Sequence, residues 1–579
     1  MPKPNRRGVA MATGVAVLAT LPYLNTTSNE FVYDDYAQVV RNDLVRSLSP
    51  LPSLSQGSVT HGQVEWYRPL TIYSFALNYA FGGLRPFLYH VTNIVLHAAN
   101  SLLVAALVWR LSRSAVVTVT SAALFAVHAV HTEAVTPVFG RADLLSAFFV
   151  LAGWCLSLEG PSLPLRRRLT IALLFVAGLL AKESAVALLA VIVVSDLLRA
   201  NAPERSFSSR LGNLLNQRRG LYVALGLALT GYTLLRFAAV GGVRAYGAVT
   251  RYIENPLVEA GPLQGVATAL WVAAKYVLLF LVPYPLAADY SYRQIPLIQS
   301  WTDPRLLALL IAASCAVLIV ALWRRAPLAA LGLIAFSLLL APVSNVFFTI
   351  GTIMAERVLY LPSVGLCLFA GWAISEGMSR ALPWRAATLV LVAFVLVANF
   401  WVAVLRNRDW QSDETLFAAT VRTSPASAKA HFNYASLLLE RSDDLEAERL
   451  LLRAIQIAPA YPEAHNLLGT ILLARNDLSA AEQEFRAAVR DAPGYAPALV
   501  NLGMALVRQE RYVEAEPVLK EAVARDASLA AAYANLGLIF EFRGDGEQAA
   551  AMYESAYALD PSLEALRTRA RELAGDEAR

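Results

Sequence analysis

The sequence has little charge and almost no cysteine, and both shortages limit what the chain can be. Only 16% of its 579 residues are charged, and 57% are hydrophobic, whereas soluble domains carry about 25% charged residues. Together with a mean hydropathy of +0.48, this excludes an ordinary soluble globule. The three cysteines all lie in apolar runs and predict neither a disulfide framework nor a metal cluster: Cys155, Cys315 and Cys367.

Motifs for nucleotide chemistry are also missing. The chain contains no G-x-x-x-x-G-K-[ST], no G-x-G-x-x-G and no H-E-x-x-H, so it has no nucleotide-driven motor of its own. The net charge of +5 is small for this length, and the basic residues stand at the ends of apolar runs. That pattern suits membrane topology and predicts no nucleic-acid partner. Lysine is rare beside arginine, which is typical of a GC-rich bacterial genome.

Long apolar stretches fill the first 405 residues. Several reach the length of about 20 residues that a transmembrane helix needs, so we expect an all-α, polytopic bundle of about 11–12 spans. The stretches are 8–24, 87–111, 115–131, 142–158, 168–181, 184–199, 220–238, 264–283, 305–323, 327–348, 357–376 and 386–405.

Basic residues beside these stretches predict the orientation. Lys3, Arg6 and Arg7 place the N-terminus in the cytoplasm by the positive-inside rule, and we take the first stretch as an uncleaved span. The later arginines all fall on the cytoplasmic side only if the segment 264–283 does not cross the membrane. We therefore expect a re-entrant segment at 264–283 and eleven membrane-spanning helices. The region after residue 405 then lies outside, in the periplasm.

That region repeats with a period of 34 residues over 425–563. Small residues recur where two helices of a helix–turn–helix unit cross closely, which is typical of tetratricopeptide repeats. The clearest series are His431, His465, Leu499 and Tyr533; Ala435, Gly469, Gly503 and Gly537; and Ala454, Ala488, Ala522 and Ala556.

Two adjacent carboxylates, Asp34 and Asp35, follow the first span in the segment Phe31–Tyr36. Like charge and partial desolvation raise the pKa of at least one of them, and such a group suits a general base that takes a proton from a hydroxyl. The alternative is a solvated loop or a helix cap.

A second polar group falls inside an apolar stretch, at His90, Asn93, His97 and Asn100. On a helix these positions share one face, which predicts a polar bundle interior or a substrate path. The histidines are two turns apart and do not form a metal pair. Hydrogen bonding between helices is the alternative.

Other charged residues and histidines are expected on the outer side. Arg141 suits a phosphate because guanidinium binds it in bidentate fashion, although a structural ion pair with Asp143 fits equally well. For the others a salt bridge is as consistent as a ligand contact: His128, His131, Glu133, Lys182, Glu183, Arg236, Asp289, Glu356 and Arg357.

These motifs, in this order, resemble a known family. The segments Phe31–Asp35, His90–His97, His128–Asp143, Ala181–Glu183 and Ala355–Ser363 lead into Asp409–Glu414 and then the repeats. The chain resembles the transmembrane and tetratricopeptide-repeat-containing O-mannosyltransferases and their bacterial relatives. It departs at Ala129, where a proline is expected after the histidine.

The resemblance implies a GT-C-type glycosyltransferase that inverts a sugar, mannose by the family's example, taken from a polyprenyl-phosphate donor. The acidic pair Asp34–Asp35 matches the catalytic motif. The outer-side residues named above, together with His90 and His97, would hold the donor. No tightly bound cofactor is expected, and metal dependence stays open. Ser/Thr hydroxyls of a polypeptide would be the acceptor, bound by the repeats with Asn433, Asn501 and Asn535, in a bacterial inner membrane.

The expected domains are a membrane domain at 1–405, a connector with a helix at 406–427, four repeats at 428–563 and a capping helix with a tail at 564–579. Three other functions remain open: a glycosyltransferase with a lipid or glycan acceptor, a membrane assembly factor without enzymatic activity, and a flippase or exporter.

Overall fold

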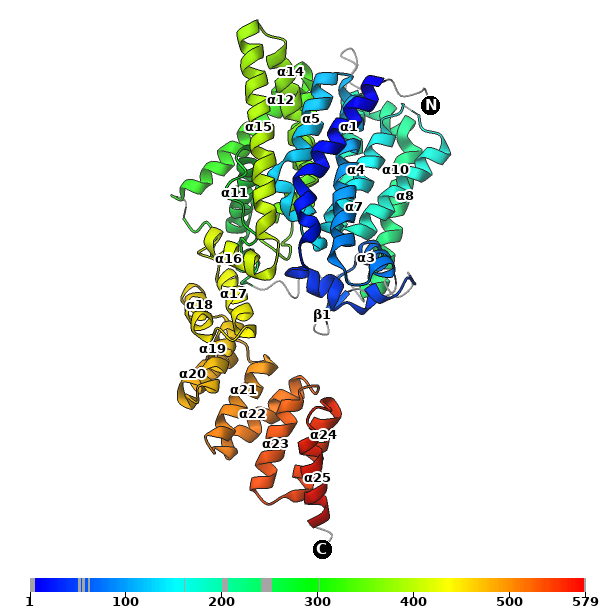
Figure 1. Cartoon of the computed structure of the whole chain (residues 1–579). Coiled ribbons are helices and arrows are strands. Elements are labelled where there is room, and N and C mark those ends of the chain that lie inside the picture. Colours follow the sequence, from blue (N-terminus) through cyan, green and yellow to red (C-terminus); the bar gives the residue numbers. More distant parts are fainter. Residues whose placement is uncertain are drawn as a thin grey trace. The chain divides into compact units, whose positions relative to one another are not determined.

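The structure is a computed structural model that describes residues 6–49, 54, 58–60, 63–160, 162–199, 207–240, 252–300 and 302–576; Lys3 and the last residues of the expected tail fall outside them. The chain forms two compact units. Unit 1 comprises Met1–Ser291 and Ile295–Ser424, and unit 2 comprises Tyr292–Gln294 and Pro425–Arg579 (Figure 1).

Unit 1 is helical, as the apolar stretches predict, and each of the twelve stretches lies on a helix. The one short hairpin described pairs β1 (Ser58–Thr60) with β2 (Gln63–Trp66). The helices are α1 (Arg6–Thr20, extended by the 3-10 helix Leu21–Ser28), α3 (Pro69–Gly82), α4 (Pro86–Ser112), α5 (Ala115–Val127), α6 (Thr132–Val135), α7 (Arg141–Ser157), α8 (Leu165–Ala181), α9 (Ala187–Arg199), α10 (Phe207–Val240), α11 (Pro262–Leu281), α12 (Leu307–Arg325), α13 (Pro327–Leu340), α14 (Ser363–Met378), α15 (Leu382–Asp409) and α16 (Asp413–Thr423).

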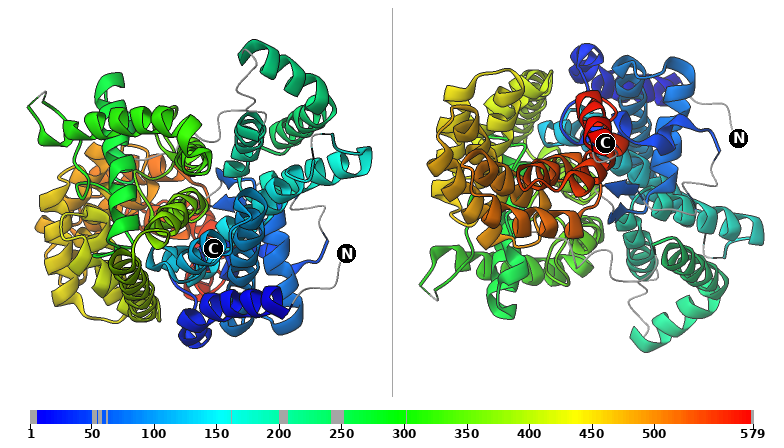
Figure 2. Two further views of the ribbon diagram at one scale, coloured as in Figure 1. Left: turned by 90° about the horizontal axis from the view of Figure 1, so that it is seen from above. Right: turned by 90° about the horizontal axis from the view of Figure 1, so that it is seen from below.

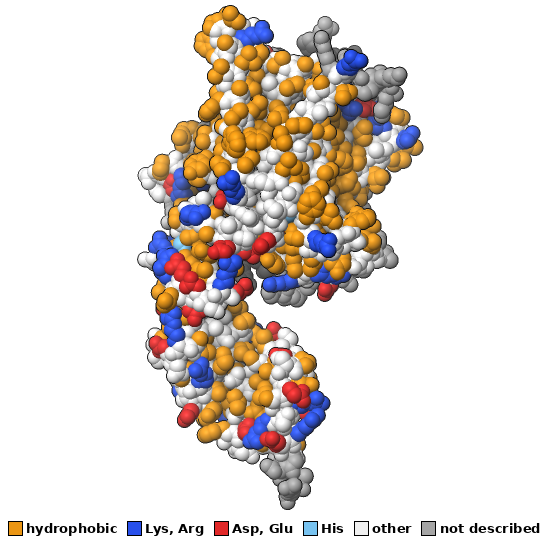
Figure 3. Space-filling model, viewed as in Figure 1, with side chains coloured by type: hydrophobic (Ala, Val, Ile, Leu, Met, Phe, Trp, Pro, Cys, Tyr) orange, Lys and Arg blue, Asp and Glu red, His pale blue; other side chains and the backbone are white. Residues whose placement is uncertain are grey.

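Seven of the described helices are long and apolar enough to cross a membrane, or eight if the pair Ala115–Val127 and Ala129–Val135, bent by 48°, is one span. Three of them are barely covered by protein: 6% of the apolar window is buried in Pro304–Arg325, and 11% in Gly212–Val240 and in Leu382–Asp409. Hydrophobic side chains cover the visible surface of unit 1, with charged ones toward its two ends (Figure 3). Apolar surface of this extent is stable only when lipid covers it.

Polar side chains face inward instead. On α4, His90, Asn93, His97 and Asn100 are all buried, so the prediction of a polar bundle interior is confirmed. Seen end-on, α10 lies at the margin of the unit, against α8 and α9 (Figure 2). Inside the unit the polar residues of α4 bond to neighbouring backbone, which fixes how the central helices pack.

Helix α11, which contains most of the segment 264–283 that we expected to be re-entrant, is a continuous helix of 20 residues. The break between the two helices of the bent pair lies at His128. Nevertheless, both flanks of α11 meet the same loop between α13 and α14. Before α11, Asn255 donates to Asn345 Oδ1 (3.0 Å) and to the Ile350 carbonyl (2.8 Å). After α11, Ala287 and Tyr290 donate to Glu356. The chain segments that precede and follow α11 therefore lie at the same end of unit 1.

Unit 2 stacks four helix pairs and a last helix. Their bounds are α17 (Ala428–Glu440) with α18 (Asp444–Ile457), α19 (Pro462–Ala474) with α20 (Leu478–Asp491), α21 (Ala496–Arg508) with α22 (Tyr512–Arg525), α23 (Ala530–Phe542) with α24 (Gly546–Leu559), and α25 (Glu564–Asp576). The glycine series marks the crossing points. A Cβ at Gly469 would lie 2.6 Å from Phe485 Cε1, and one at Gly537 would lie 2.5 Å from Tyr553 Cε1.

A buried ion pair joins α19 to α20 and makes the stability of this repeat depend on pH. His465 Nδ1 lies 2.6 Å from Glu484, and Nε2 lies 2.9 Å from the Pro459 carbonyl. Burial acts to lower the pKa of His465, but these two acceptors outweigh it and raise the pKa above its usual value. A raised folded pKa stabilises the repeat below the unfolded pKa, and this contribution is lost as pH rises through the folded pKa.

We therefore expect α19 and α20 to open more readily as pH rises through the raised pKa of His465, and His465→Gln to abolish that dependence. Hydrogen exchange of the full chain, corrected for intrinsic rates, measures it. His431→Gln is the matched control, because His431 holds the equivalent position and bonds to the Pro425 carbonyl. Equal pH dependence in wild type and His465→Gln would contradict the prediction.

Candidate functional site

Charged side chains from five separated segments meet at one end of unit 1. They come from the turn after the first helix, from α6, from the first turn of α7, from the residues after α8 and from the 3-10 helix Glu356–Leu359. Two ion pairs tie the segments together: Glu133 Oε1 to Arg357 Nη1 at 2.5 Å, and Asp143 Oδ1 to Lys182 Nζ at 2.6 Å.

Asp35 builds the turn that carries the acidic pair. Its side chain is fully buried and accepts three backbone N–H groups, from Val32 (3.1 Å), Val138 (3.3 Å) and Phe139 (2.7 Å). The last two open the helical segment that leads into α7, where a carboxylate is favoured by the unpaired N–H groups. Burial raises the pKa of Asp35 to about 7, and the three N–H donors oppose that rise. Asp35 thus acts as the helix cap weighed in the sequence analysis.

Asp34 is the more accessible of the two acids, because it is only half-buried. It lies close to Arg357. Burial acts to lower the pKa of Arg357, but the carboxylates of Glu133, Asp34 and Asp143 outweigh it and raise that pKa. The Arg357 guanidinium also lies over the Phe139 ring, with Cζ 5.0 Å from its centroid. Asp34 therefore lies within electrostatic range of a cation that Glu133 and Phe139 hold in place.

Two further arginines extend the cationic cluster. Glu183 bridges Arg68 (3.2 Å) and Arg236 (3.1 Å). Burial lowers the pKa of Lys182, the Asp143 carboxylate opposes this, and Arg68 and Arg357 lower it further, as expected when cations crowd together. Arg68 was missed by sequence reasoning: it stands alone before Pro69, and only its position at the start of α3 hints at this end of the bundle.

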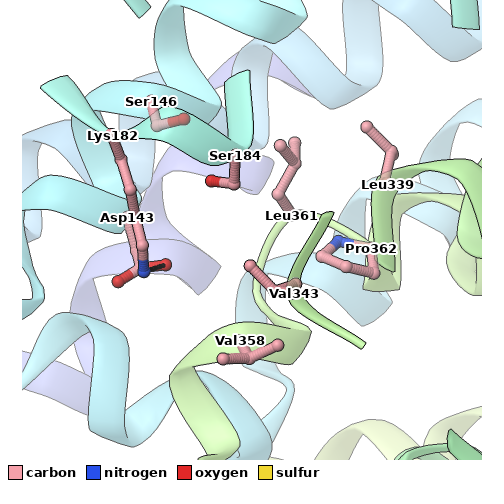
Figure 4. A pocket seen from close by; sticks show the side chains of 9 residues that line it. All are labelled: Asp143, Ser146, Lys182, Ser184, Leu339, Val343, Val358, Leu361 and Pro362. Carbon is pink, nitrogen blue, oxygen red and sulfur yellow. Dashed lines mark hydrogen bonds and ion pairs between the residues drawn. The ribbon is translucent and has the colours of Figure 1, made fainter. Parts of the chain in front are cut away.

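A pocket opens beside the Asp143–Lys182 pair and has two unlike walls (Figure 4). Asp143, Ser146, Lys182 and Ser184 supply the polar wall. The apolar wall opposite comes from α13, from the 3-10 helices after it and from the start of α14, with Leu339, Val343, Val358, Leu361 and Pro362. The cavity is small, with about 10 Å³ of space, which is room for about one water molecule.

Arg141 is not available to a ligand in this structure. The side chain is fully buried, and its nitrogens donate to Asn93, Asn78, Ser74 and the Tyr89 carbonyl. The guanidinium thereby ties α7 to α3 and α4. The predicted pair of Arg141 with Asp143 does not form; Asp143 binds Lys182 instead.

Four histidines that the structure describes in unit 1, namely His90, His97, His128 and His131, are also buried and bonded within it. His90 contacts the carbonyls of Thr136 and Asn29, and His97 contacts the Tyr360 hydroxyl and the Ala126 carbonyl. His128 contacts the Phe280 carbonyl, and His131 contacts Ser363. These contacts favour the alternative of hydrogen bonding between helices over donor binding.

Two further candidates in unit 1, Glu356 and Asp289, are bonded to neighbouring residues. Glu356 is fully buried and accepts from Ala287 and Tyr290, while burial raises its pKa to about 8. The Asp289 side chain accepts from Ser291.

In the repeats, Asn433 is half-buried, Asn501 donates to Asn466 (2.9 Å) and Asn535 donates to the Ala531 carbonyl (2.8 Å).

Metal ligation has no cluster to support it within the described ranges, where no group of three or more His, Cys, Asp or Glu side chains is placed to hold an ion.

The cap made by Asp35 gives a prediction about stability. Asp35→Asn would turn an amide NH₂ toward N–H donors that now meet a carboxylate, and a buried unsatisfied donor costs about 1–3 kcal/mol. We expect a lower thermal unfolding midpoint in detergent than for Asp43→Asn, which removes an exposed acid from a neighbouring 3-10 helix. An unchanged midpoint would contradict the capping role.

Sequence comparison confirms the family resemblance. The profile described as "Protein O-mannosyl-transferase TMTC, DUF1736" matches residues 251–317, and tetratricopeptide-repeat profiles match 403–462, 446–496 and 494–562. The human protein O-mannosyl-transferase TMTC1 is 30% identical over 505 residues, which cover 77% of this chain and 55% of that protein. Human TMTC4 is 30% identical over 483 residues, covering 75% and 64%.

The fruit-fly (Drosophila melanogaster) Tmtc1 is 29% identical over 536 residues, covering 77% of this chain and 61% of that protein. This chain thus spans between about half and two thirds of the length of the curated relatives it matches. Among solved structures, YrrB, described as a tetratricopeptide-repeat protein with an unusual peptide-binding site, is 18% identical, with a TM-score of 0.24, and covers 35% of this chain and 96% of that one.

Proposed function

We propose that this chain is a membrane glycosyltransferase of the GT-C type. It would move a hexose, mannose by the example of its relatives, from a polyprenyl-phosphate donor to Ser/Thr hydroxyls of a protein, with inversion. One observation carries the proposal: a half-buried carboxylate, Asp34, lies within electrostatic range of Arg357, a cation that is fixed by Glu133, at the end of a lipid-exposed helical bundle. The relatives named as protein O-mannosyl-transferases supply the reaction class.

Asp34 is the base in this proposal, and Asp35 is its support. A carboxyl group with a pKa near 7, such as Asp35, is well tuned for proton transfer. However, a base must also reach the proton, and Asp35 is completely buried with both oxygens engaged by backbone N–H groups. Asp34 is the acid of the pair that a hydroxyl can approach.

The donor would lie beside the small cavity of Figure 4, with its polyprenyl chain along Leu339, Val343 and Leu361. Its phosphate would lie near Lys182, which lines the cavity, and near Arg357, which pairs with Glu133. Cations placed where negative charge develops stabilise a leaving phosphate. Because the lipid tail stays in the bilayer, the transferase has to be embedded there as well.

The reaction is a single displacement. Asp34 takes the proton of the acceptor hydroxyl, the hydroxyl oxygen bonds to the anomeric carbon, and the bond from that carbon to the phosphate oxygen breaks. The electron pair leaves with polyprenyl phosphate, and attack from the opposite face inverts the anomeric centre. The chain's residues supply a base and cations, so the step needs no tightly bound cofactor.

The arrangement of the helices supports the expected topology, with a cytoplasmic N-terminus and the site on the periplasmic side of a bacterial inner membrane. The chain segments that precede and follow α11 lie at the same end of unit 1, which agrees with 264–283 not changing sides. Basic residues flank the opposite ends of several helices, as with Arg110 in the last turn of α4 and Arg324 and Arg325 in that of α12. The repeats would then be periplasmic.

The repeats would bind the polypeptide acceptor. Stacked helix pairs present a concave surface suited to extended chains, and the amides of Asn433, Asn501 and Asn535 offer sequence-tolerant hydrogen bonds. In this proposal 1–405 is the catalytic domain, 406–427 connects it to the repeats at 428–563, and 564–579 caps them.

Sugar transfer by the purified chain in proteoliposomes tests the proposal. We expect labelled polyprenyl-phosphate mannose to label protein in a periplasmic extract, and Asp34→Asn to reduce the rate by at least about 100-fold, the scale of lost general-base catalysis. Asp43→Asn, an exposed acid in the same loop region, is the control.

Label that appears on lipid or glycan instead of protein would overturn the acceptor assignment. Full activity in a folded Asp34→Asn variant would overturn the assignment of the base. No transfer by wild type with mannose, glucose and arabinose donors would overturn the transferase and favour export or assembly.

A further inference from the structure

The backbone before Asp34 is held by a residue about 380 positions away in sequence. Tyr33 has a left-handed backbone, with φ of 52°, which a tyrosine adopts only when its surroundings compensate. Its N–H donates to Asp413 Oδ1 at 2.8 Å. Asp413 lies in the first turn of α16, whose N-cap is Ser412.

Three more hydrogen bonds join Asn29 and Glu30 to the segment before α16. The Glu30 N–H donates to the Gln411 carbonyl at 3.0 Å. The Asn29 amide donates to the Trp410 carbonyl at 3.0 Å and to the Asn407 carbonyl at 3.4 Å. The segment that leads to Asp34 is thereby fixed by hydrogen bonds from its backbone and from the Asn29 side chain, and not by packing alone.

Aromatic packing sets the direction in which the turn faces. The Tyr33 ring meets Phe139 (centroids 6.4 Å apart) and Phe417 (6.1 Å), both edge-on. Val32 belongs to a buried cluster with Phe139, Trp410 and Leu416. One side of the turn therefore rests on the 3-10 helix Val138–Gly140 that precedes α7, and the other rests on α16.

We infer that Asp413 is a positioning residue that holds Asp34 in place for proton transfer; the inference rests on the proposed function. Hydrogen bonds to two carboxylates hold the residues on either side of Asp34. Asp35, the next residue, accepts the Phe139 N–H, and Asp413 accepts the N–H of Tyr33, the preceding residue. The effect of misplacing a catalytic group by about 1 Å is up to 100-fold in rate, so loss of one clamp is expected to lower kcat.

Glu414 provides a matched control. It stands beside Asp413 in the same first turn of α16, so removal of either carboxylate weakens the same charge–dipole interaction at the helix N-terminus. Only Asp413 accepts from Tyr33 among the contacts described here. Asp413→Asn is the second control, because an amide oxygen still accepts that N–H while the charge is gone.

The experiment measures transfer kinetics and hydrogen exchange of Asp413→Ala, Asp413→Asn and Glu414→Ala in the full chain. We expect Asp413→Ala to lower kcat at least 10-fold with less than a twofold change in KM for the donor. Its exchange at residues 29–35 should rise, while Asp413→Asn and Glu414→Ala stay within about twofold of wild type in both measurements.

Equal losses in Asp413→Ala and Glu414→Ala would overturn the inference in favour of general helix stability, as would a change in KM alone. If wild type transfers no sugar, the proposed function fails by itself. In that case unchanged exchange at residues 29–35 in Asp413→Ala would also refute the clamp, and a selective rise would support the clamp without the catalytic role.

Discussion

The account depends on one buried carboxylate, that of Asp35. A buried carboxyl group is tolerated only when its oxygens find hydrogen-bond donors in place of water, and here three backbone N–H groups supply them. Those groups come from both the turn before Asp35 and the helical segment before α7, so a single side chain joins two segments about 100 residues apart. The position of Asp34 follows from this bond, because its neighbour in the chain cannot move.

The same principle orders the rest of this end of unit 1. Glu133 with Arg357, Asp143 with Lys182, and Glu183 with two arginines form closed pairs. Pairing lowers the cost of keeping charges beside lipid, and it places one cation, Lys182, in the lining of the cavity. An anionic donor could join this cluster without the protein having to bury an isolated charge.

Much of the fold followed from the sequence. Helix-length apolar runs and the 34-residue period are strong signals, and the buried face of α4 followed from its spacing. The roles within the site were harder to predict. Arg141 and the histidines have side chains that suit ligand binding, but they are buried and their hydrogen bonds hold the helices of unit 1 together. Whether Asp34 or Asp35 is accessible depends on a turn whose partners, Phe139 and Asp413, are remote in sequence. Arg68 carried no local signal.

The most direct test of the central claim is an experimental structure of the Asp34→Asn variant in nanodiscs with bound polyprenyl-phosphate mannose. The account predicts the phosphate near Lys182 and Arg357, the anomeric carbon facing the side chain at position 34, and Asp35 still bonded to the Phe139 N–H. A sugar placed against Asp35 with that bond broken, or a donor bound elsewhere in the bundle, would contradict it.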